Sequence, residues 1–206
     1  MEIKNKYQDG ESRLLGITED NFGVETREVN GEKIDYIVGY GVVFNSESQV
    51  LYDFVERIEP TAADGLDMSR VVATINHDFS KILARTDSGT LKLSVDSRGI
   101  KYEFPLPNTT YAMDLKENIR IGNIKGSSFI FSTAEDRWTH YDDPAKPSLR
   151  EVLKFRAIYE MGPVTSPAYL DTTVAQRSLE NTKQPEYDFA TRQKRIKILK
   201  LKLNGK

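Results

Sequence analysis

The chain contains no cysteine and only two histidines, and these two shortages restrict the chemistry that it can perform. Without cysteine it can form no disulfide, no thiolate nucleophile and no cysteine-based zinc site. Any mechanism that needs an imidazole must use His77 or His140. Because these two histidines lie far apart in the sequence, they do not form a zinc-binding motif, and a zinc enzyme is disfavoured.

Long apolar runs and phosphate-binding loops are missing as well. No run of about 18 apolar residues occurs, so we expect no membrane span. Residues 1–13 lack the apolar core of a secretory signal. No Gly-x-x-x-x-Gly-Lys or Gly-x-Gly-x-x-Gly element follows a predicted strand. The aspartates of the central region also lack the spacing of a calcium loop: Asp67, Asp78, Asp87 and Asp96.

Length and charge divide the chain into three predicted parts. A chain of 206 residues with 38% hydrophobic residues favours one globular domain with extensions. Residues 179–206 contain eight Lys or Arg and three acids, so this tail has a net charge of +5 and the rest of the chain −7. We predict a loose N-terminal arm over residues 1–22, a domain over residues 23–178 and a basic tail over residues 179–206.

Alternating hydrophobic residues predict two hairpins. Residues 33–44 alternate with the period of a strand, and one face is expected to carry Ile34, Tyr36, Val38, Tyr40, Val42 and Phe44. Asn30-Gly31 favours a tight turn before it, with residues 24–29 as the partner strand. A second hairpin is predicted over residues 90–104, where Gly99 is expected to supply the unusual backbone angle of the turn.

One helix and two further strands complete the prediction. Capping residues and helical spacing predict a helix near residues 110–120. Residues 127–133 and 151–161 alternate as strands, whereas residues 136–147 are rich in charge and proline and are expected to form a loop or hairpin end. Residues 163–167 contain two prolines and are expected to break the last strand. The predicted class is α+β, with a mainly antiparallel β-sheet or barrel and packed helices.

Candidate catalytic residues follow from the scarcity of histidine. Catalysis by a serine needs a base within hydrogen-bond reach and a third group that orients the base. His77 follows an apolar run and has polar neighbours, as expected of a histidine at a strand end; the alternative is a surface or structural histidine. Ser128 lies in a small-residue entry to a strand, and its alternative is a hydroxyl satisfied by the backbone. The Gly-x-Ser-x-Gly pattern of α/β-hydrolases is absent.

Glu160 is the candidate for the orienting group. It lies near the end of a predicted strand, on the face opposite the more apolar one, where a carboxylate can orient an imidazole. The alternative is a surface glutamate paired with Lys154 or Arg156. His140 is a rival for this role, but it lies in a polar segment beside Trp138, so we expect an ordinary exposed histidine.

Several motifs, taken in order, resemble the prohead (capsid maturation) proteases of tailed bacteriophages. They correspond to an opening strand, an acidic segment that ends in proline, a histidine motif, a hairpin, a serine motif and a closing motif. The matching stretches are residues 39–45 with Ser48, 56–62, 76–78, 83–86, 88–91 with 99–100, 126–131, and 159–169 with Arg177. Their order and spacing over about residues 39–177 carry the resemblance.

The resemblance implies a fold and a set of catalytic residues. The family is similar in fold to the herpesvirus assembly proteases, which form a small, mostly antiparallel barrel ringed by helices. When the catalytic residues of the family are transferred to the matching positions of this sequence, the nucleophile is Ser128, the general base is His77 and the third catalytic position is Glu160. Ser128 is preferred over Ser127 because it directly precedes Phe-x-Phe, and Ile130 stands where the family often has glycine. The implied reaction is peptide hydrolysis through an acyl-enzyme, with no metal and no organic cofactor.

The resemblance also implies partners and a location. The expected substrates are the major capsid protein, a scaffold protein and the protease itself, cut inside the assembling prohead in the host-cell cytoplasm. Since the herpesvirus enzymes dimerise, a homo-oligomer is an expectation. Residues 191–206 carry seven Lys or Arg and no acid; they predict a tail that targets acidic scaffold or capsid, a nucleic-acid contact, or a flexible solvated end. The alternatives for the whole chain are a catalytically inactive phage structural module of the same fold and a binding protein with an accidental likeness.

Overall fold

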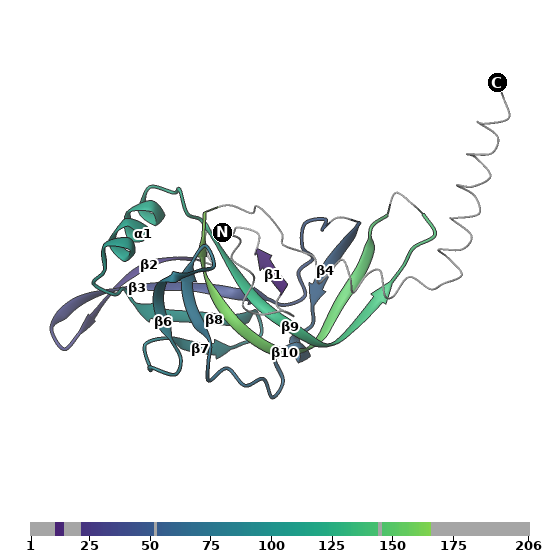
Figure 1. Cartoon of the computed structure of the whole chain (residues 1–206), viewed down its shortest axis with the longest axis horizontal. Coiled ribbons are helices and arrows are strands. Elements are labelled where there is room, and N and C mark those ends of the chain that lie inside the picture. The colour runs from purple at the N-terminus through teal and green to yellow at the C-terminus, as the bar shows by residue number, and fades with distance from the viewer. Residues whose placement is uncertain (1–10, 15–21, 52, 144–145, 166–206) are drawn as a thin grey trace, which may run out of the picture. The chain divides into compact units, whose positions relative to one another are not determined.

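A computed structural model describes residues 11–14, 22–51, 53–143 and 146–165. These residues belong to one unit of the chain, Met1–Asp171, and form two β-sheets, one α-helix and one short 3-10 helix (Figure 1). The predicted basic tail and its boundary near residue 178 lie outside the described residues. The elements are β1 (Glu11–Leu14), β2 (Phe22–Val29), β3 (Glu32–Val43), β4 (Phe54–Ile58), η2 (Pro60–Ala63), β5 (Val72–Ile75), β6 (Asp78–Arg85), β7 (Lys92–Val95), β8 (Gly99–Pro105), α1 (Thr110–Arg120), β9 (Gly126–Thr139) and β10 (Ser148–Val164).

The first sheet is built around the long β9–β10 hairpin. Its strand order is β1-β9-β10-β5-β6, and β4 also pairs with β10. β9 and β10 are antiparallel, whereas β4 and β5 run parallel to β10, so the sheet is mixed rather than purely antiparallel. The end of the β9–β10 hairpin extends beside β4 (Figure 1).

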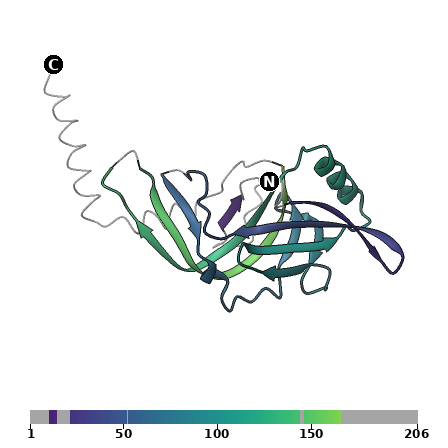
Figure 2. The same ribbon diagram turned by 180° about the vertical axis from the view of Figure 1, so that it is seen from behind.

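The second sheet has the order β2-β3-β8-β7 and is antiparallel throughout. Both predicted hairpins are confirmed. Asn30 and Gly31 have φ of 54° and 85°, as a type I′ turn requires, and the β2–β3 hairpin projects at the α1 end of the fold (Figures 1 and 2).

A bulge divides the core face of β3 into two parts. Sequence alternation predicted one face from Ile34 to Phe44, but the register shifts between Tyr40 and Val42. Before the bulge the fully buried residue is Ile37, and after it Val42. Because both faces of this strand carry apolar residues, the sequence pattern alone did not reveal where the core face changes.

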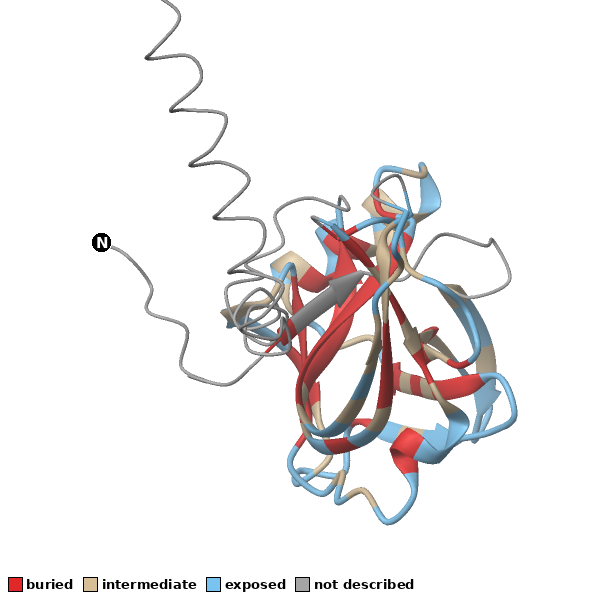
Figure 3. Ribbon diagram, turned by 90° about the vertical axis from the view of Figure 1, so that its right-hand side faces the viewer, coloured by how far each residue is buried: buried red, intermediate tan, exposed pale blue. Residues whose placement is uncertain are grey.

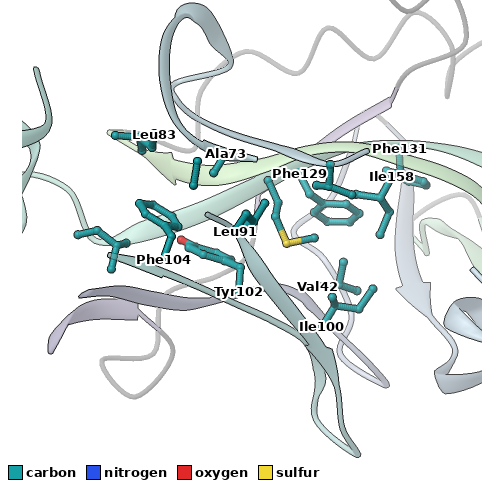
Figure 4. Close-up of a cluster of buried hydrophobic side chains, with 14 of the residues drawn as sticks. Val42, Ala73, Leu83, Leu91, Ile100, Tyr102, Phe104, Phe129, Phe131 and Ile158 are labelled. Carbon is teal, nitrogen blue, oxygen red and sulfur yellow. The ribbon is translucent and has the colours of Figure 1, made fainter. Parts of the chain in front are cut away.

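The hydrophobic core lies between the two sheets. Figure 4 shows Phe129, Phe131 and Ile158 of the first sheet directed toward Val42 and Ile100 of the second. The rings of Phe129 and Phe131 stack with centroids 4.9 Å apart. Most buried residues lie in strands (Figure 3), whereas the loops and the two edge strands of the second sheet, β2 and β7, are mostly exposed or intermediate, as expected when two sheets bury one face each.

The predicted helix is confirmed as α1 and closes one end of the core. It buries Ala112 and Leu115. Lys116 donates a 2.5 Å hydrogen bond to Asp35 of β3, and the Tyr111 hydroxyl donates one of 2.7 Å to the carbonyl of Ile82 in β6. The helix therefore ties one strand of each sheet together.

Several expectations need correction. The described residues contain one α-helix rather than several, and they form two sheets with no closed barrel. Part of the expected loose arm, Glu11–Leu14, is a strand, because it pairs with the open edge of β9. A sequence pattern of four residues is too short to predict this pairing. The loop or hairpin end expected over residues 136–147 is the end of the β9–β10 hairpin, but β9 continues four residues into it, to Thr139, because it pairs with β10 that far. β10 ends at Val164, within the segment expected to break it, but it includes Pro163, because its partners on β9 extend to Gly126.

The turn between β7 and β8 depends on Gly99 for a reason other than the predicted one. Gly99 has no positive φ; instead it lies against β3, where a Cβ would be 1.9 Å from the carbonyl oxygen of Val42. The turn itself is held by Asp96, whose carboxylate accepts hydrogen bonds from the backbone N–H groups of Arg98 and Gly99.

We expect Gly99→Ala to lower the free energy of unfolding by about 1–3 kcal/mol, because backbone must move to admit the methyl group. Gly23→Ala is the matched control, since nothing lies within 4 Å of its Cβ position and the loss of chain flexibility should leave stability unchanged or slightly higher. Urea denaturation of both variants measures the difference. Equal midpoints would contradict the close approach of β3 and β8.

Candidate active site

Ser128 and Glu160 are placed by the pairing of β9 with β10. Ser128 lies directly opposite Gly162, and Glu160 lies opposite Ile130. The two are therefore diagonal neighbours on adjacent strands, close enough for a side chain between them to reach both. A register shift between Ile158 and Glu160 is a β-bulge, a feature that often redirects a side chain beside an active site.

His77 lies on the tight turn that joins β5 to β6. Ile75 pairs with Asp78, so Asn76 and His77 are the two central residues of the turn, and their φ angles are 53° and 59°. This is the geometry of a type I′ turn, in which glycine usually follows asparagine. A left-handed conformation costs a non-glycine residue roughly 1–2 kcal/mol, and such strain often occurs at functional sites.

Asn76 fixes the turn to the end of β10. Its backbone N–H donates a 3.0 Å hydrogen bond to the carbonyl of Pro163. Its side-chain oxygen accepts a 2.8 Å bond from the backbone N–H of Thr165 and a 3.2 Å bond from the hydroxyl of the same residue. The hairpin that carries His77 is thereby anchored to the strand that carries Glu160.

The imidazole joins the serine to the glutamate. His77 Nδ1 lies 2.6 Å from Glu160 Oε2, and His77 Nε2 lies 2.7 Å from Ser128 Oγ. An ionised carboxylate only accepts hydrogen bonds. We therefore assign the proton to Nδ1, which leaves Nε2 to accept from the serine hydroxyl. The arrangement has the geometry of a serine, a base and an orienting acid.

Glu160 is buried where water cannot solvate its charge. The residue is fully buried, and Thr74 of β5 donates a 2.7 Å hydrogen bond to its second oxygen, Oε1. Gly162 allows this approach, because a Cβ there would be 2.2 Å from the Thr74 carbonyl oxygen and 3.3 Å from Glu160 Oε1. Burial of a carboxylate is costly unless it is paired and hydrogen-bonded, and His77 and Thr74 supply those partners.

Ser127, the neighbour that the sequence left as a rival nucleophile, faces a different partner. Its hydroxyl shares a 2.7 Å hydrogen bond with the hydroxyl of Tyr102 on β8. Burial raises the pKa of Tyr102 well above its usual value, and the charge of Glu160 raises it further, whereas the bond to Ser127 acts in the opposite direction. Tyr102 is therefore a neutral structural partner of Ser127.

His140, the other rival, is not brought to this site. Its Nδ1 lies 2.9 Å from the hydroxyl of Ser148, and its ring stacks on Trp138. The carboxylate that lies beside His77 is that of Glu160. Thr74 and Asn76 were missed by sequence reasoning, because a buried threonine in a strand and an asparagine in a turn are common, and only the folded chain brings them to His77.

Among residues 11–14, 22–51, 53–143 and 146–165, no group of three His, Asp or Glu side chains is placed to hold a metal ion. In the same part of the chain, no helix is long and apolar enough to span a membrane.

Comparison with known proteins gives a matching family and a structural neighbour. Residues 21–185 match the family described as caudovirus prohead serine protease. The fold is also similar to the bacteriophage T4 capsid assembly protease gp21, with 11% sequence identity and a TM-score of 0.47 over 77% of this chain and 98% of that chain. No curated protein gives a match.

We expect Thr74→Val to lower the free energy of unfolding by about 1–3 kcal/mol, because it removes a hydrogen bond to a buried carboxylate. The control is the same substitution in a Glu160→Met protein, where no carboxylate remains and the change should be below about 0.5 kcal/mol. Denaturant titration of the four proteins gives the coupling energy. An equal cost in both backgrounds would rule out the Thr74–Glu160 bond as its source.

Proposed function

The chain belongs to the family of caudovirus prohead serine proteases, which are capsid maturation enzymes, and from that premise we propose that Ser128, His77 and Glu160 are its catalytic residues. The observation that carries this proposal is the unbroken series of hydrogen bonds from Ser128 through His77 to Glu160, at 2.7 and 2.6 Å. The three residues lie on β9, on the β5–β6 turn and on β10, which are distant in the sequence. An accidental contact at the surface would not be expected to include a fully buried carboxylate such as that of Glu160.

In the first half of the reaction Ser128 Oγ attacks the carbonyl carbon of the scissile peptide bond. His77 Nε2 accepts the hydroxyl proton as the new C–O bond forms. The same imidazole then delivers that proton to the leaving amine as the C–N bond breaks. The products are a free amino terminus and an acyl group esterified to Ser128.

In the second half a water molecule replaces the amine. His77 takes a proton from this water as its oxygen attacks the ester carbonyl carbon. The imidazole returns that proton to Ser128 Oγ as the bond between the acyl carbon and Oγ breaks, which releases the new carboxyl terminus. Glu160 keeps the proton of the neutral imidazole on Nδ1 and stabilises the imidazolium that forms in each half-reaction. Thr74 is a positioning residue, because its bond to Glu160 Oε1 directs Oε2 toward His77.

The proposed substrates are the major capsid protein or a scaffold protein of the prohead, and the protease itself. The family supports this proposal, since its members act in prohead maturation. The alternative is a module of the same fold that has lost activity. The strained turn at His77 argues against it, because a chain without need of the imidazole gains stability by replacing His77 with glycine.

Labelling with a fluorophosphonate tests the nucleophile without knowledge of the substrate. We expect the wild-type protein to gain one phosphonyl group on Ser128, measured by intact mass and peptide mapping. Ser128→Ala should gain none, because it lacks the nucleophilic oxygen. Ser127→Ala is the matched control and should still be labelled at Ser128. Labelling of the Ser128→Ala protein at Ser127 would show that the wrong serine was chosen.

Cleavage is then measured with the same variants, alone and with assembled capsid or scaffold protein, as intact mass against time. Discrete fragments with wild-type and Ser127→Ala, and none with Ser128→Ala, are the expected result. Identical fragments with all three proteins would indicate a contaminating protease. Labelling at Ser128 without cleavage of itself, capsid or scaffold would refute the proposed substrates and retain the catalytic residues.

Glu160→Gln tests the orienting role separately. We expect the rate of labelling at Ser128 to fall by about 10³- to 10⁴-fold, since an amide donates to Nδ1 and favours the wrong imidazole tautomer. The control is Glu28→Gln, an exposed glutamate near the β2–β3 turn, which should label at the wild-type rate. A Glu160→Gln protein that is folded by circular dichroism and labels normally would exclude Glu160 from the mechanism.

A further inference from the structure

The N-terminal strand β1 lies beside the proposed nucleophile. It pairs antiparallel with the edge of β9 that β10 leaves open, and its register runs from Glu11 opposite Phe131 to Leu14 opposite Ser128. Addition of a strand to an open sheet edge is a common way for proteins to bind an extended peptide. In this arrangement Ser128 is only 3% exposed, so a substrate cannot reach its hydroxyl unless a neighbouring segment moves.

The anchor of β1 is a buried arginine. Arg150 of β10 is 1% exposed and Glu11 3% exposed. Both terminal nitrogens of the guanidinium bond to the Glu11 carboxylate: Nη1 to Oε2, and Nη2 to Oε1 at 3.0 Å. The Thr133 hydroxyl donates a further bond of 3.1 Å to Oε1. Bidentate pairing of this kind gives both strength and geometric selectivity.

The other donors of Arg150 are used by the body of the fold. Nε donates to Asp136 at 2.8 Å, Nη1 to Glu56 at 2.9 Å, and Nη2 to Thr133 at 3.1 Å. With the two bonds to Glu11, all five N–H groups of the guanidinium have acceptors. If β1 leaves the edge, two of these buried N–H groups lose their acceptor, and an incoming carboxylate at the same register restores both bonds.

The charge balance of this cluster limits the net attraction of Arg150 for Glu11. Glu11, Glu56 and Asp136 place three negative charges around one guanidinium. Burial acts to lower the pKa of Arg150, but these carboxylates together raise it well above its usual value, so it stays charged. Because Glu56 and Asp136 already neutralise Arg150, part of the attraction for Glu11 is offset by repulsion between carboxylates and by the cost of burying them.

We propose that the edge of β9 covered by β1 is a binding site for an extended polypeptide with an acidic side chain three residues before the position opposite Ser128, and that β1 occupies it as a built-in pseudosubstrate. Arg150 is then the specificity-determining residue, since an uncharged side chain at that register leaves buried guanidinium donors without an acceptor. The inference rests on the proposed function of Ser128 and adds a substrate class and a self-blocked resting state.

Peptide binding to the full chain tests this proposal without any cleavage. The protein carries Ser128→Ala, and the probe is a fluorescent peptide of residues 9–16 of this chain. We expect this peptide to bind about tenfold more tightly than a peptide with Gln in place of Glu11, a loss typical of one charge-assisted pair. Because only the peptide changes, no folding defect can imitate this result.

A change in the protein tests the pseudosubstrate. Glu11→Gln in the full-length chain weakens the anchor of β1, so the glutamate peptide should bind about tenfold more tightly than to a protein with Glu32→Gln, an exposed glutamate at the start of β3. A tethered strand competes at an effective concentration of about millimolar. The titration therefore extends into that range.

Each outcome decides between the two proposals. Equal affinity of the two peptides, absence of binding to the Glu11→Gln protein at millimolar peptide, or no difference between the Glu11→Gln and Glu32→Gln proteins would overturn this inference, and β1 would be a structural strand. Selective binding together with no fluorophosphonate labelling of Ser128 in the Glu11→Gln protein, where the anchor of β1 is weakened and Ser128 is kept, would instead overturn the catalytic proposal and leave this site standing. Labelling of Ser128 without a difference between the two peptides would overturn the peptide-binding site and leave the catalytic proposal standing.

Discussion

The antiparallel pairing of β9 with β10 is the constraint on which the site depends. One ladder of backbone hydrogen bonds sets Ser128 opposite Gly162, two residues from Glu160. The backbone pairing alone therefore fixes the separation of Ser128 and Glu160, without any contribution from side-chain contacts. The missing side chain at Gly162 gives Thr74 access to the carboxylate. Only His77 comes from a separate hairpin, and Asn76 removes that freedom by bonding to Pro163 and Thr165.

The two sheets have different tasks. The first sheet carries the polar groups at both buried sites, the His77–Glu160 pair and the Arg150 cluster, whose carboxylates come from Glu11, Glu56 and Asp136. The second sheet contributes mainly the apolar face of the core, with Tyr102 as its polar contact to β9. The buried charges are concentrated on the first sheet. The second sheet buries mainly apolar surface, and this burial offsets the free-energy cost of desolvating those charges.

Much of this architecture could be predicted from local patterns, and the failures share one cause. Both hairpins and α1 follow from turn residues and periodicity, and the scarcity of histidine limited the candidates for a base to two. Strict alternation failed in β10, where register shifts place every third residue in the core: Val152, Phe155, Ile158 and Met161. Bulges, the strand β1, the close approach at Gly99 and the bond from Thr74 all depend on partners distant in the sequence, and period-two patterns contain no information about them.

The left-handed turn at Asn76 and His77 has a consequence for how this part of the sequence evolves. At this turn the sequence that folds best and the sequence that keeps the imidazole differ by one residue, because glycine after asparagine relieves the strain that histidine bears. Selection on stability alone therefore favours losing the imidazole. If His77 is the base, as proposed, a lineage released from catalysis would drift toward Asn-Gly here, and the residue at this position in related chains would record whether selection still maintains the imidazole.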